Sequence, residues 1–261
     1  MRILVRLFII ISFCITSTSV FSQPSLAADK KQAVYSARME LYMQMESLYG
    51  IPWTYLAALD QYERTLIRKR KGNSNAAPAA SRRVTSIQIS PSAWSGPLNP
   101  VEDETNETAI SFFDGMGVDG SGDGKADQTD DLDVLTTITR FLSQYGFSRE
   151  DFRIGIWMYY QRDRAVKTID QFVKVYEHYQ TLDLHQHAFP IPSKYDFSYR
   201  DTWGDARGWG GRRIHEGTDI FADYGTPVLS TGYGVVEVVG WNRYGGWRIG
   251  YRDMDNIYHY V

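Results

Sequence analysis

The chain has 261 residues, a formal net charge of −3 and a pI near 6.0. This length fits one large domain or two modest ones, and a chain without a basic stripe gives no reason to expect a nucleic acid as partner. Aromatic residues make up 14% of the chain, including 18 Tyr, which suits a packed core as well as a carbohydrate or peptide groove.

The N-terminus has the layout of a secretory signal peptide. Arg2 and Arg6 precede a short apolar run, and a polar stretch follows that ends in the small residues SLAA. The apolar run is shorter than the ~20 residues that span a bilayer. We therefore expect a signal peptide over residues 1–28, cleaved after Ala27 or Ala28. The expected location is secreted or in the cell envelope, without stable membrane insertion after cleavage; the alternative is an uncleaved anchor.

Cysteine usage agrees with an envelope location. The single cysteine, Cys14, lies inside the apolar run of the predicted signal peptide. The mature chain is therefore expected to contain no disulfide. A secreted chain of this kind fits a bacterial envelope better than an animal extracellular space.

Residues 29–183 are predicted to form a helical domain. Apolar residues recur at steps of three and four in its first segment, namely at Val34, Ala37, Leu41, Met45 and Leu48. This pattern predicts a helix with one apolar stripe. Gly50 stands where a C-terminal helix cap belongs, and Pro52 suits the first turn of a second helix.

Two further helices are predicted near the end of this domain. Ser148 and Asp151 form a capping pair before FRIGIWMYYQ, and another helix is expected from about Arg164 to Tyr179. The intervening stretches KRKGNSNAAPAASRR and SAWSGPLNPVEDETNE are rich in charged, small and turn-forming residues. We expect both to be loops.

The stretch GIPWTYLAALDQYERTL resembles the start of lysozyme-like lytic transglycosylase domains, in which Ile-Pro, an apolar helix and a glutamate recur. The resemblance implies that Glu63 is the catalytic acid, a buried carboxyl group that protonates a glycosidic oxygen. Arg64 departs from the family, which usually has Ser after the glutamate, and a downstream G-L-M-Q-type segment is absent. The alternative is a structural or helix-surface glutamate.

The segment VDGSGDGKADQTDD has the spacing of a calcium loop. Loop positions one, three, five, seven and nine are Asp119, Ser121, Asp123, Lys125 (through its carbonyl) and Asp127. Gly124 permits the sharp turn at position six, but Asp130 replaces the bidentate glutamate expected at position twelve. The sequence leaves two interpretations open: a Ca²⁺ site, as in some lytic transglycosylases, or a solvated turn that caps the next helix.

The composition changes after about residue 182. Pro, Gly and aromatic residues become frequent, and short β-branched runs follow that are broken by Gly and Asn. This pattern predicts strands and turns. We place a boundary near residues 180–190 and a second domain over 184–261, which makes the predicted fold class α+β.

His215 and Asp219 are the first candidates for a metal site. They stand four residues apart with Gly217 between them, in a segment that reads as extended. Such spacing places both side chains on one face, and an imidazole with a carboxylate suits Zn²⁺. On spacing alone, an ordinary surface pair is the more common outcome.

The stretch HEGTDIFADYGTPVLSTGYGVVEVVGW is similar to the first motif of lysostaphin-type zinc metallopeptidases, H-x-G-x-D-(I/Y)-x-A-x-x-G-T-P-V followed by x-G-x-V. The resemblance extends over Phe189 to Val261. It implies a small antiparallel β domain, zinc bound by His215 and Asp219, and peptidoglycan as the partner. With the helical part, the layout resembles the L-Ala–D-Glu endopeptidases that act in spore cortex maturation.

The chain also departs from this family. The later H-x-H motif, which supplies the third zinc ligand, is absent, and the Y-x-H-L segment would place its histidine just past Val261. We therefore expect an incomplete peptidase domain, truncated at its C-terminus. His259 is either a substitute catalytic residue or an ordinary strand histidine. His185 and His187 share the H-x-H spacing but lie before His215, in the predicted linker, so we expect a chance pair.

Three functions remain open on these grounds. The first is a secreted zinc endopeptidase that cuts the peptide stems of peptidoglycan. The second is a lytic transglycosylase-type glycosidase that uses Glu63. The third is a non-catalytic wall-binding or regulatory protein, because the chain lacks the later histidine ligands.

Overall fold

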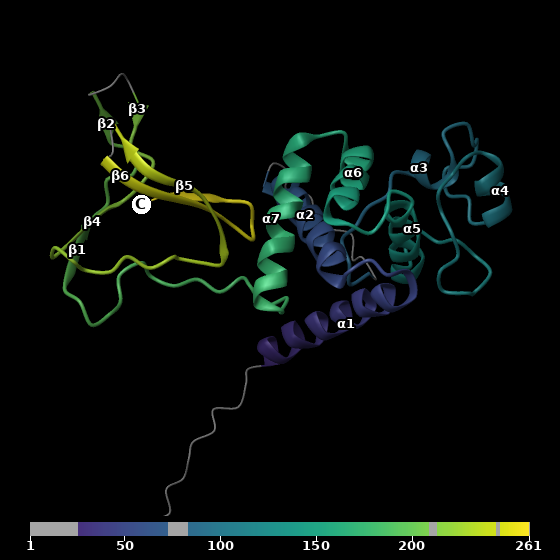
Figure 1. Ribbon diagram of the computed structural model, residues 1–261, viewed down its shortest axis with the longest axis horizontal. Coiled ribbons are helices and arrows are strands. Elements are labelled where there is room, and N and C mark those ends of the chain that lie inside the picture. The colour runs from purple at the N-terminus through teal and green to yellow at the C-terminus, as the bar shows by residue number, and fades with distance from the viewer. Residues whose placement is uncertain (1–25, 73–82, 209–212, 244–245, 261) are drawn as a thin grey trace, which may run out of the picture.

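The computed structural model describes residues 26–72, 83–208, 213–243 and 246–260, and it confirms the α+β class (Figure 1). The helices are α1 (Leu26–Tyr49), α2 (Trp53–Gly72), α3 (Pro91–Ser95), α4 (Glu107–Phe112), α5 (Asp131–Ser143), α6 (Arg149–Tyr160) and α7 (Asp163–Tyr179). The strands are β1 (Phe197–Arg200), β2 (Ala206–Arg207), β3 (Arg213–Ile214), β4 (Asp219–Ala222), β5 (Gly234–Asn242), β6 (Gly246–Asp253) and β7 (Tyr258–Tyr260). The predicted signal peptide, residues 1–28, lies almost wholly outside the described residues.

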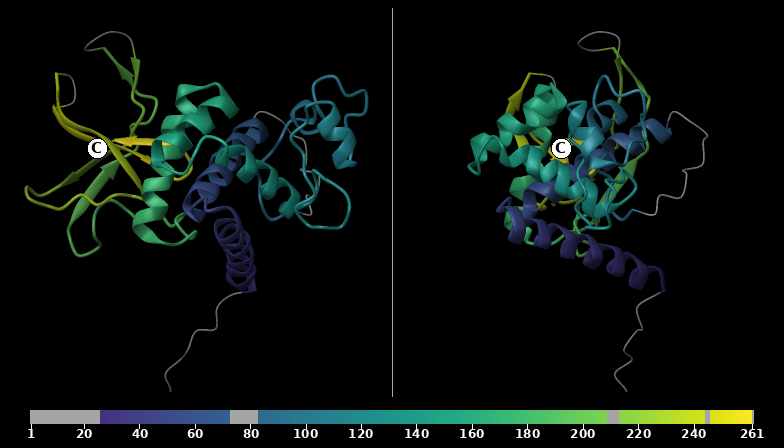
Figure 2. Two further views of the ribbon diagram at one scale, coloured as in Figure 1. Left: turned by 45° about the vertical axis from the view of Figure 1, so that its right-hand side comes forward. Right: turned by 90° about the vertical axis from the view of Figure 1, so that its right-hand side faces the viewer.

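Helix α2 forms the centre of the helical half. Residues 54–63 are all buried, as is expected of a helix that other elements surround on every side. Helix α7 packs along α2, and α1, α5 and α6 complete the bundle (Figure 2). Among the described residues, no helix is both long and apolar enough to cross a membrane.

The buried face of α1 differs from the predicted stripe. Val34 and Leu48 are exposed, whereas Arg38 and Tyr42 are buried. Both of these side chains hydrogen-bond the carboxylate of Asp60 in α2, at 2.6 Å and 2.7 Å. The helix is therefore rotated by about one residue relative to the apolar pattern, because a buried ion pair fixes its orientation.

The predicted helix ends are confirmed. Gly50 follows α1 with a φ of +75°, the left-handed conformation that favours glycine. At the start of α6, the Ser148 hydroxyl accepts the backbone N–H of Asp151, whose carboxylate accepts the backbone N–H of Ser148 at 3.0 Å. This reciprocal pair is a capping box.

Within its described residues, the β half contains three small antiparallel sheets, formed by β1 with β4, β2 with β3, and β5 with β6 and β7. Many large apolar side chains of β5 and β6 stay exposed, for example Val239 at 71% and Trp247 at 79%. Tyr251 and Met254, near the end of β6, are among the few buried ones. The apolar core of the described residues thus lies mainly in the helical half.

The two halves meet where α7 packs against β5 (Figure 1). The Gln171 side chain of α7 donates to the Glu237 carboxylate at 2.8 Å, and Lys167 pairs with the same carboxylate at 3.2 Å. From α2, the Gln61 amide donates to the backbone carbonyl of Met254 at 2.6 Å. These contacts place the strand region directly against the helical core.

Candidate active site

The fold brings His215 and Asp219 together. His215 follows β3, and Asp219 opens β4, where it lies opposite Arg200 of β1. The His215 Nε2 atom is 3.5 Å from the Asp219 Oδ1 atom. The side chains are 15% and 42% exposed, so the pair is reachable from solvent.

The separation of these two atoms suits a shared metal ion. A short N–H···O hydrogen bond spans about 2.7–3.2 Å, and the pair lies beyond that range at 3.5 Å. Two ligands on a tetrahedral zinc, each about 2.0–2.2 Å from the ion, lie on the order of 3.4 Å apart. The 3.5 Å separation is that of a His–Asp ion pair and also matches the spacing of two ligands on one zinc ion.

Thr202 contacts both candidate ligands, although no motif in the sequence singles it out. Its backbone carbonyl lies 3.1 Å from His215 Nδ1, and its hydroxyl donates to Asp219 Oδ2 at 3.3 Å. A carbonyl at Nδ1 favours the tautomer with its proton on that nitrogen, which leaves the Nε2 lone pair available for a metal ion. A polar residue shortly before the first histidine is the only signal that the sequence offers for this role.

The backbone around His215 is also held in place. His215 N–H donates to the carbonyl of Asp205 at 2.9 Å, and the His215 carbonyl accepts Gly204 N–H at 2.8 Å. These bonds pair the histidine with the segment that carries Thr202. The imidazole is therefore positioned through both its main chain and its side chain.

A third ligand does not join this pair within the described ranges, where no three His, Cys, Asp or Glu side chains come close enough to hold a metal ion. His259 lies in β7 and contacts the buried Asp253 carboxylate at 2.7 Å. It also stacks on Tyr251, with ring centroids 4.9 Å apart. These contacts agree with the strand-histidine interpretation, and a catalytic role of His259 stays a prediction.

His185 and His187 contact different parts of the fold. His185 Nδ1 lies 3.2 Å from an Asp255 carboxylate oxygen, whereas His187 forms an isolated bridge with Gly232. Their sequence spacing therefore corresponds to two separate local contacts.

Glu63 is buried in α2, with 4% of the residue exposed. Tyr160 O–H donates to its Oε1 atom at 2.6 Å. Burial raises the pKa of the Glu63 carboxyl group, and the Tyr160 hydrogen bond and the Arg70 charge oppose the rise only in part. The helix-surface interpretation of Glu63 is therefore wrong. A buried carboxyl group with a raised pKa is what a general acid needs.

Arg64, which departs from the transglycosylase pattern, takes part in a structural network. Its Nε atom donates to Asp60 at 2.9 Å, and its Nη2 atom donates to the Val84 carbonyl at 2.6 Å. The side chain thus ties α2 to the segment that follows residues 73–82.

The acidic loop is organised by its own backbone. Asp119 Oδ1 accepts Gly122 N–H at 2.6 Å, and Oδ2 accepts Gly124 N–H at 2.7 Å. Gly124 has a φ of +89°, which agrees with the expected sharp turn. Asp130 caps α5 by accepting the N–H groups of Leu132 and Asp133. These features agree with the helix-capping interpretation and leave calcium binding a prediction.

Comparison with known proteins gives one informative match. The chain is 52% identical over 239 residues to an L-Ala–D-Glu endopeptidase of Bacillus subtilis (strain 168), and the alignment covers 91% of this chain and 72% of that protein. No protein-family model matches the chain, and no solved structure matches it.

Proposed function

The chain belongs to the L-Ala–D-Glu endopeptidase family, and we propose that it hydrolyses the L-Ala–D-Glu bond in the peptide stems of peptidoglycan with a zinc ion held by His215 and Asp219. The family makes it a peptidoglycan endopeptidase. Zinc dependence, secretion into the cell envelope and a role in the spore cortex are further parts of the proposal.

The observation that carries the zinc assignment is the geometry of the two ligands. Nε2 of His215 and Oδ1 of Asp219 are 3.5 Å apart, and Thr202 supports both residues. Zinc bound there would supply an acidified water as nucleophile for amide hydrolysis. The chain's own contribution is to fix the imidazole tautomer and the carboxylate orientation before substrate arrives.

The zinc proposal requires a third protein ligand beside His215 and Asp219. The described residues offer no third His, Cys, Asp or Glu beside the pair. A catalytic zinc normally has three protein ligands.

Digestion of purified peptidoglycan tests the proposal. We expect new N-terminal amino groups, with D-Glu at the new ends. His215→Ala and Asp219→Ala should abolish them, and so should a chelator, with activity restored by Zn²⁺. New amino ends that persist in both variants would contradict the assignment of these two ligands.

A second candidate function is supported by Glu63. Its burial, its raised pKa and the Tyr160 hydrogen bond are properties of a general acid for glycoside cleavage. In the same digest, this function would yield anhydro-sugar ends. Glu63→Gln should no longer form these ends, whereas His215→Ala should form them as wild type does. Wall binding without new ends of either type would favour the non-catalytic alternative.

Calcium binding by the acidic loop is a separate part of the proposal. The proposed ligands are Asp119, Ser121, Asp123, the Lys125 carbonyl and Asp127. If the loop binds Ca²⁺, millimolar calcium should raise the midpoint of thermal unfolding, and Asp123→Asn should reduce that increase. An unchanged midpoint would leave helix capping as the function of the loop.

A further inference from the structure

We propose that a cationic cavity between the two halves binds carboxylate groups of the acidic stem peptide, away from the His215–Asp219 pair. The cavity has a volume of ≈430 Å³ and is lined by Lys31, Val34, Tyr35, Arg38, Arg64, Arg68, His185 and Asp255. It is thus formed by α1, α2, the segment after α7 and the β6–β7 turn. The assignment of the ligand to a stem peptide rests on the proposed function.

The floor of the cavity is a buried guanidinium group held in a fixed position. The Arg38 side chain is 4% exposed, and its Nε and Nη2 atoms donate to the Tyr42 hydroxyl and the Asp60 carboxylate. Arg64 Nε donates to the same Asp60 oxygen. One buried carboxylate therefore faces two guanidinium groups, and the positive charge is only partly balanced.

Two exposed cations, Lys31 and Arg68, also line the cavity. Lys31 Nζ pairs with Asp183 at 2.7 Å, and Arg68 pairs with Asp255. Their side chains are 47% and 52% exposed, so they can turn toward a ligand at little cost in packing. Lys31, Arg38, Arg64 and Arg68 line the cavity together with Asp255 as the single carboxylate.

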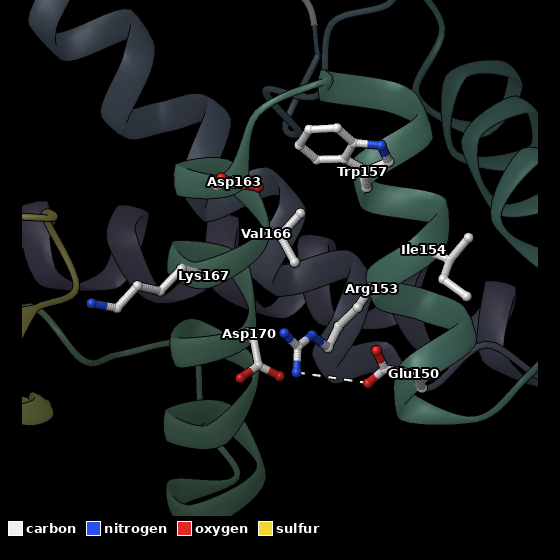
Figure 3. A pocket seen from close by; sticks show the side chains of 8 residues that line it. All are labelled: Glu150, Arg153, Ile154, Trp157, Asp163, Val166, Lys167 and Asp170. Carbon is white, nitrogen blue, oxygen red and sulfur yellow. Dashed lines mark ion pairs between the residues drawn. The ribbon is translucent and has the colours of Figure 1, made fainter.

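A second cavity has the opposite charge balance. This ≈440 Å³ cavity lies between α6 and α7 and is lined by Glu150, Arg153, Ile154, Trp157, Asp163, Val166, Lys167 and Asp170 (Figure 3). Figure 3 shows Arg153 between Glu150 and Asp170, so its charge is matched locally. Carboxylates outnumber cations in this lining. The excess of positive charge is therefore found in the lining of the cationic cavity and is absent from the lining of the second cavity.

The chemistry favours a carboxylate-bearing peptide as the ligand. Arginine side chains pair with carboxylates through directed, charge-assisted hydrogen bonds. A Glu residue joined to Ala through its amino group keeps two carboxyl groups, of which at least one stays free when the peptide continues. The Tyr35 ring and Val34 supply apolar surface beside the cations, which suits the short side chain of alanine.

Binding of L-alanyl-D-glutamate to the full chain, measured by calorimetry, tests the inference. We expect binding that weakens about tenfold when both carboxyl groups are amidated, because the amides remove the charge-assisted hydrogen bonds to the cations. Lys31→Gln with Arg68→Gln should weaken dipeptide binding about as much. The matched control is Arg153→Gln, which removes a similarly exposed cation from the other cavity and should leave binding unchanged.

Each outcome supports or overturns the inference. The inference would be overturned if the dipeptide and its diamide bound with equal affinity. It would also be overturned if Lys31→Gln with Arg68→Gln lowered the affinity for the dipeptide no more than Arg153→Gln does. Competition by inorganic phosphate at the affinity of the dipeptide would show a general anion site and overturn the peptide assignment. Thermal unfolding of each variant shows whether a loss of binding comes from a loss of fold.

The His215→Ala variant separates this inference from the proposed function. Charge-dependent binding should persist in that variant, because the cavity lining does not include His215. If His215→Ala abolishes cleavage but the wild-type chain shows no charge-dependent binding, the cavity inference fails alone. If binding depends on charge but no amino ends form, the proposed hydrolysis fails alone.

Discussion

Thr202 holds both candidate zinc ligands, and its hydroxyl group can be tested separately from its carbonyl. Thr202→Val removes the hydrogen bond to Asp219 and keeps the carbonyl that faces His215 Nδ1. Loss of an outer-shell partner typically lowers metal affinity about 10–100-fold. We therefore expect Thr202→Val to weaken zinc binding by about tenfold in a competition titration with a chromophoric chelator.

The conservative variant provides the control for this experiment. Thr202→Ser keeps a hydroxyl group at the same position and should retain most of the zinc affinity. If Ser and Val at this position weaken binding equally, the hydroxyl does not position Asp219, and only local packing is affected.

Glu63 offers a second test at this scale, because burial raises the pKa of its carboxyl group. A raised folded-state pKa means that the native state favours the protonated form. The resulting stability is fully present below the unfolded pKa near 4.5 and is lost as pH rises through the folded value. Glu63→Gln keeps an acceptor for Tyr160 and carries no charge. We expect it to unfold at a higher temperature than wild type at pH 7, with a smaller difference at pH 4.

A thermal unfolding series across this pH range measures the effect. A variant that is less stable than wild type at pH 7 would show that the ionised Glu63 is stabilised by its surroundings. In that case the carboxyl group would not be poised as an acid, and the glycosidase candidate would lose its main support.

At the scale of elements, Asp60 joins α1 to α2. Its carboxylate is fully buried and accepts hydrogen bonds from Arg38, Tyr42 and Arg64. Asp60→Asn removes the negative charge and leaves the buried Arg38 without its counter-ion. Breaking a buried pair in this way costs about 3–5 kcal/mol. We expect a loss of that size in the free energy of unfolding, measured by urea denaturation.

An exposed ion pair serves as the comparison. Asp183→Asn breaks the pair with Lys31, whose side chain is 47% exposed, and exposed pairs contribute about 0–1 kcal/mol. Similar losses in the two variants would mean that the Asp60 network does not determine how α1 packs.

The same network explains which helical features could be predicted. Caps depend on neighbours in sequence, so Gly50 and the Ser148 capping box were predictable. The buried face of α1 was not, because an apolar pattern assigns Arg38 to the surface. Helix α3 was also missed inside a predicted loop, although Ser90 caps it and Pro91 opens it.

At the scale of the whole molecule, local motifs were predictable and long-range sites were not. His215 and Asp219 lie four residues apart, so their proximity could be predicted from the local sequence. The cationic cavity is lined by residues that are as far apart in the sequence as Lys31 and Asp255. No local sequence pattern indicates that they lie together. The position of this cavity depends on how the strand region packs against α1 and α2.

Glu237 tests how the strand region packs against α7 of the helical half. Its carboxylate, on β5, binds Gln171 and Lys167 of α7 as well as Arg252 of β6. Burial acts to raise its pKa, but these partners outweigh burial and lower the pKa from 4.5 to about 2. The carboxylate therefore contributes stability that is fully present above pH 4.5 and is lost as pH falls toward 2.

Glu237→Gln should remove this contribution by leaving the Lys167 and Arg252 charges without their shared partner. Hydrogen bonds to charged groups contribute about 1.5–3 kcal/mol, and in a protein of this size each 1 kcal/mol shifts the unfolding midpoint by about 2–4 °C. We expect a midpoint several degrees below wild type at pH 7 and a difference that shrinks between pH 4.5 and pH 2. The matched control, Glu150→Gln, removes an exposed carboxylate that pairs within α6, and its midpoint should stay close to wild type. If Glu237→Gln also stays close to wild type at pH 7, then the α7–β5 contact does not stabilise the fold.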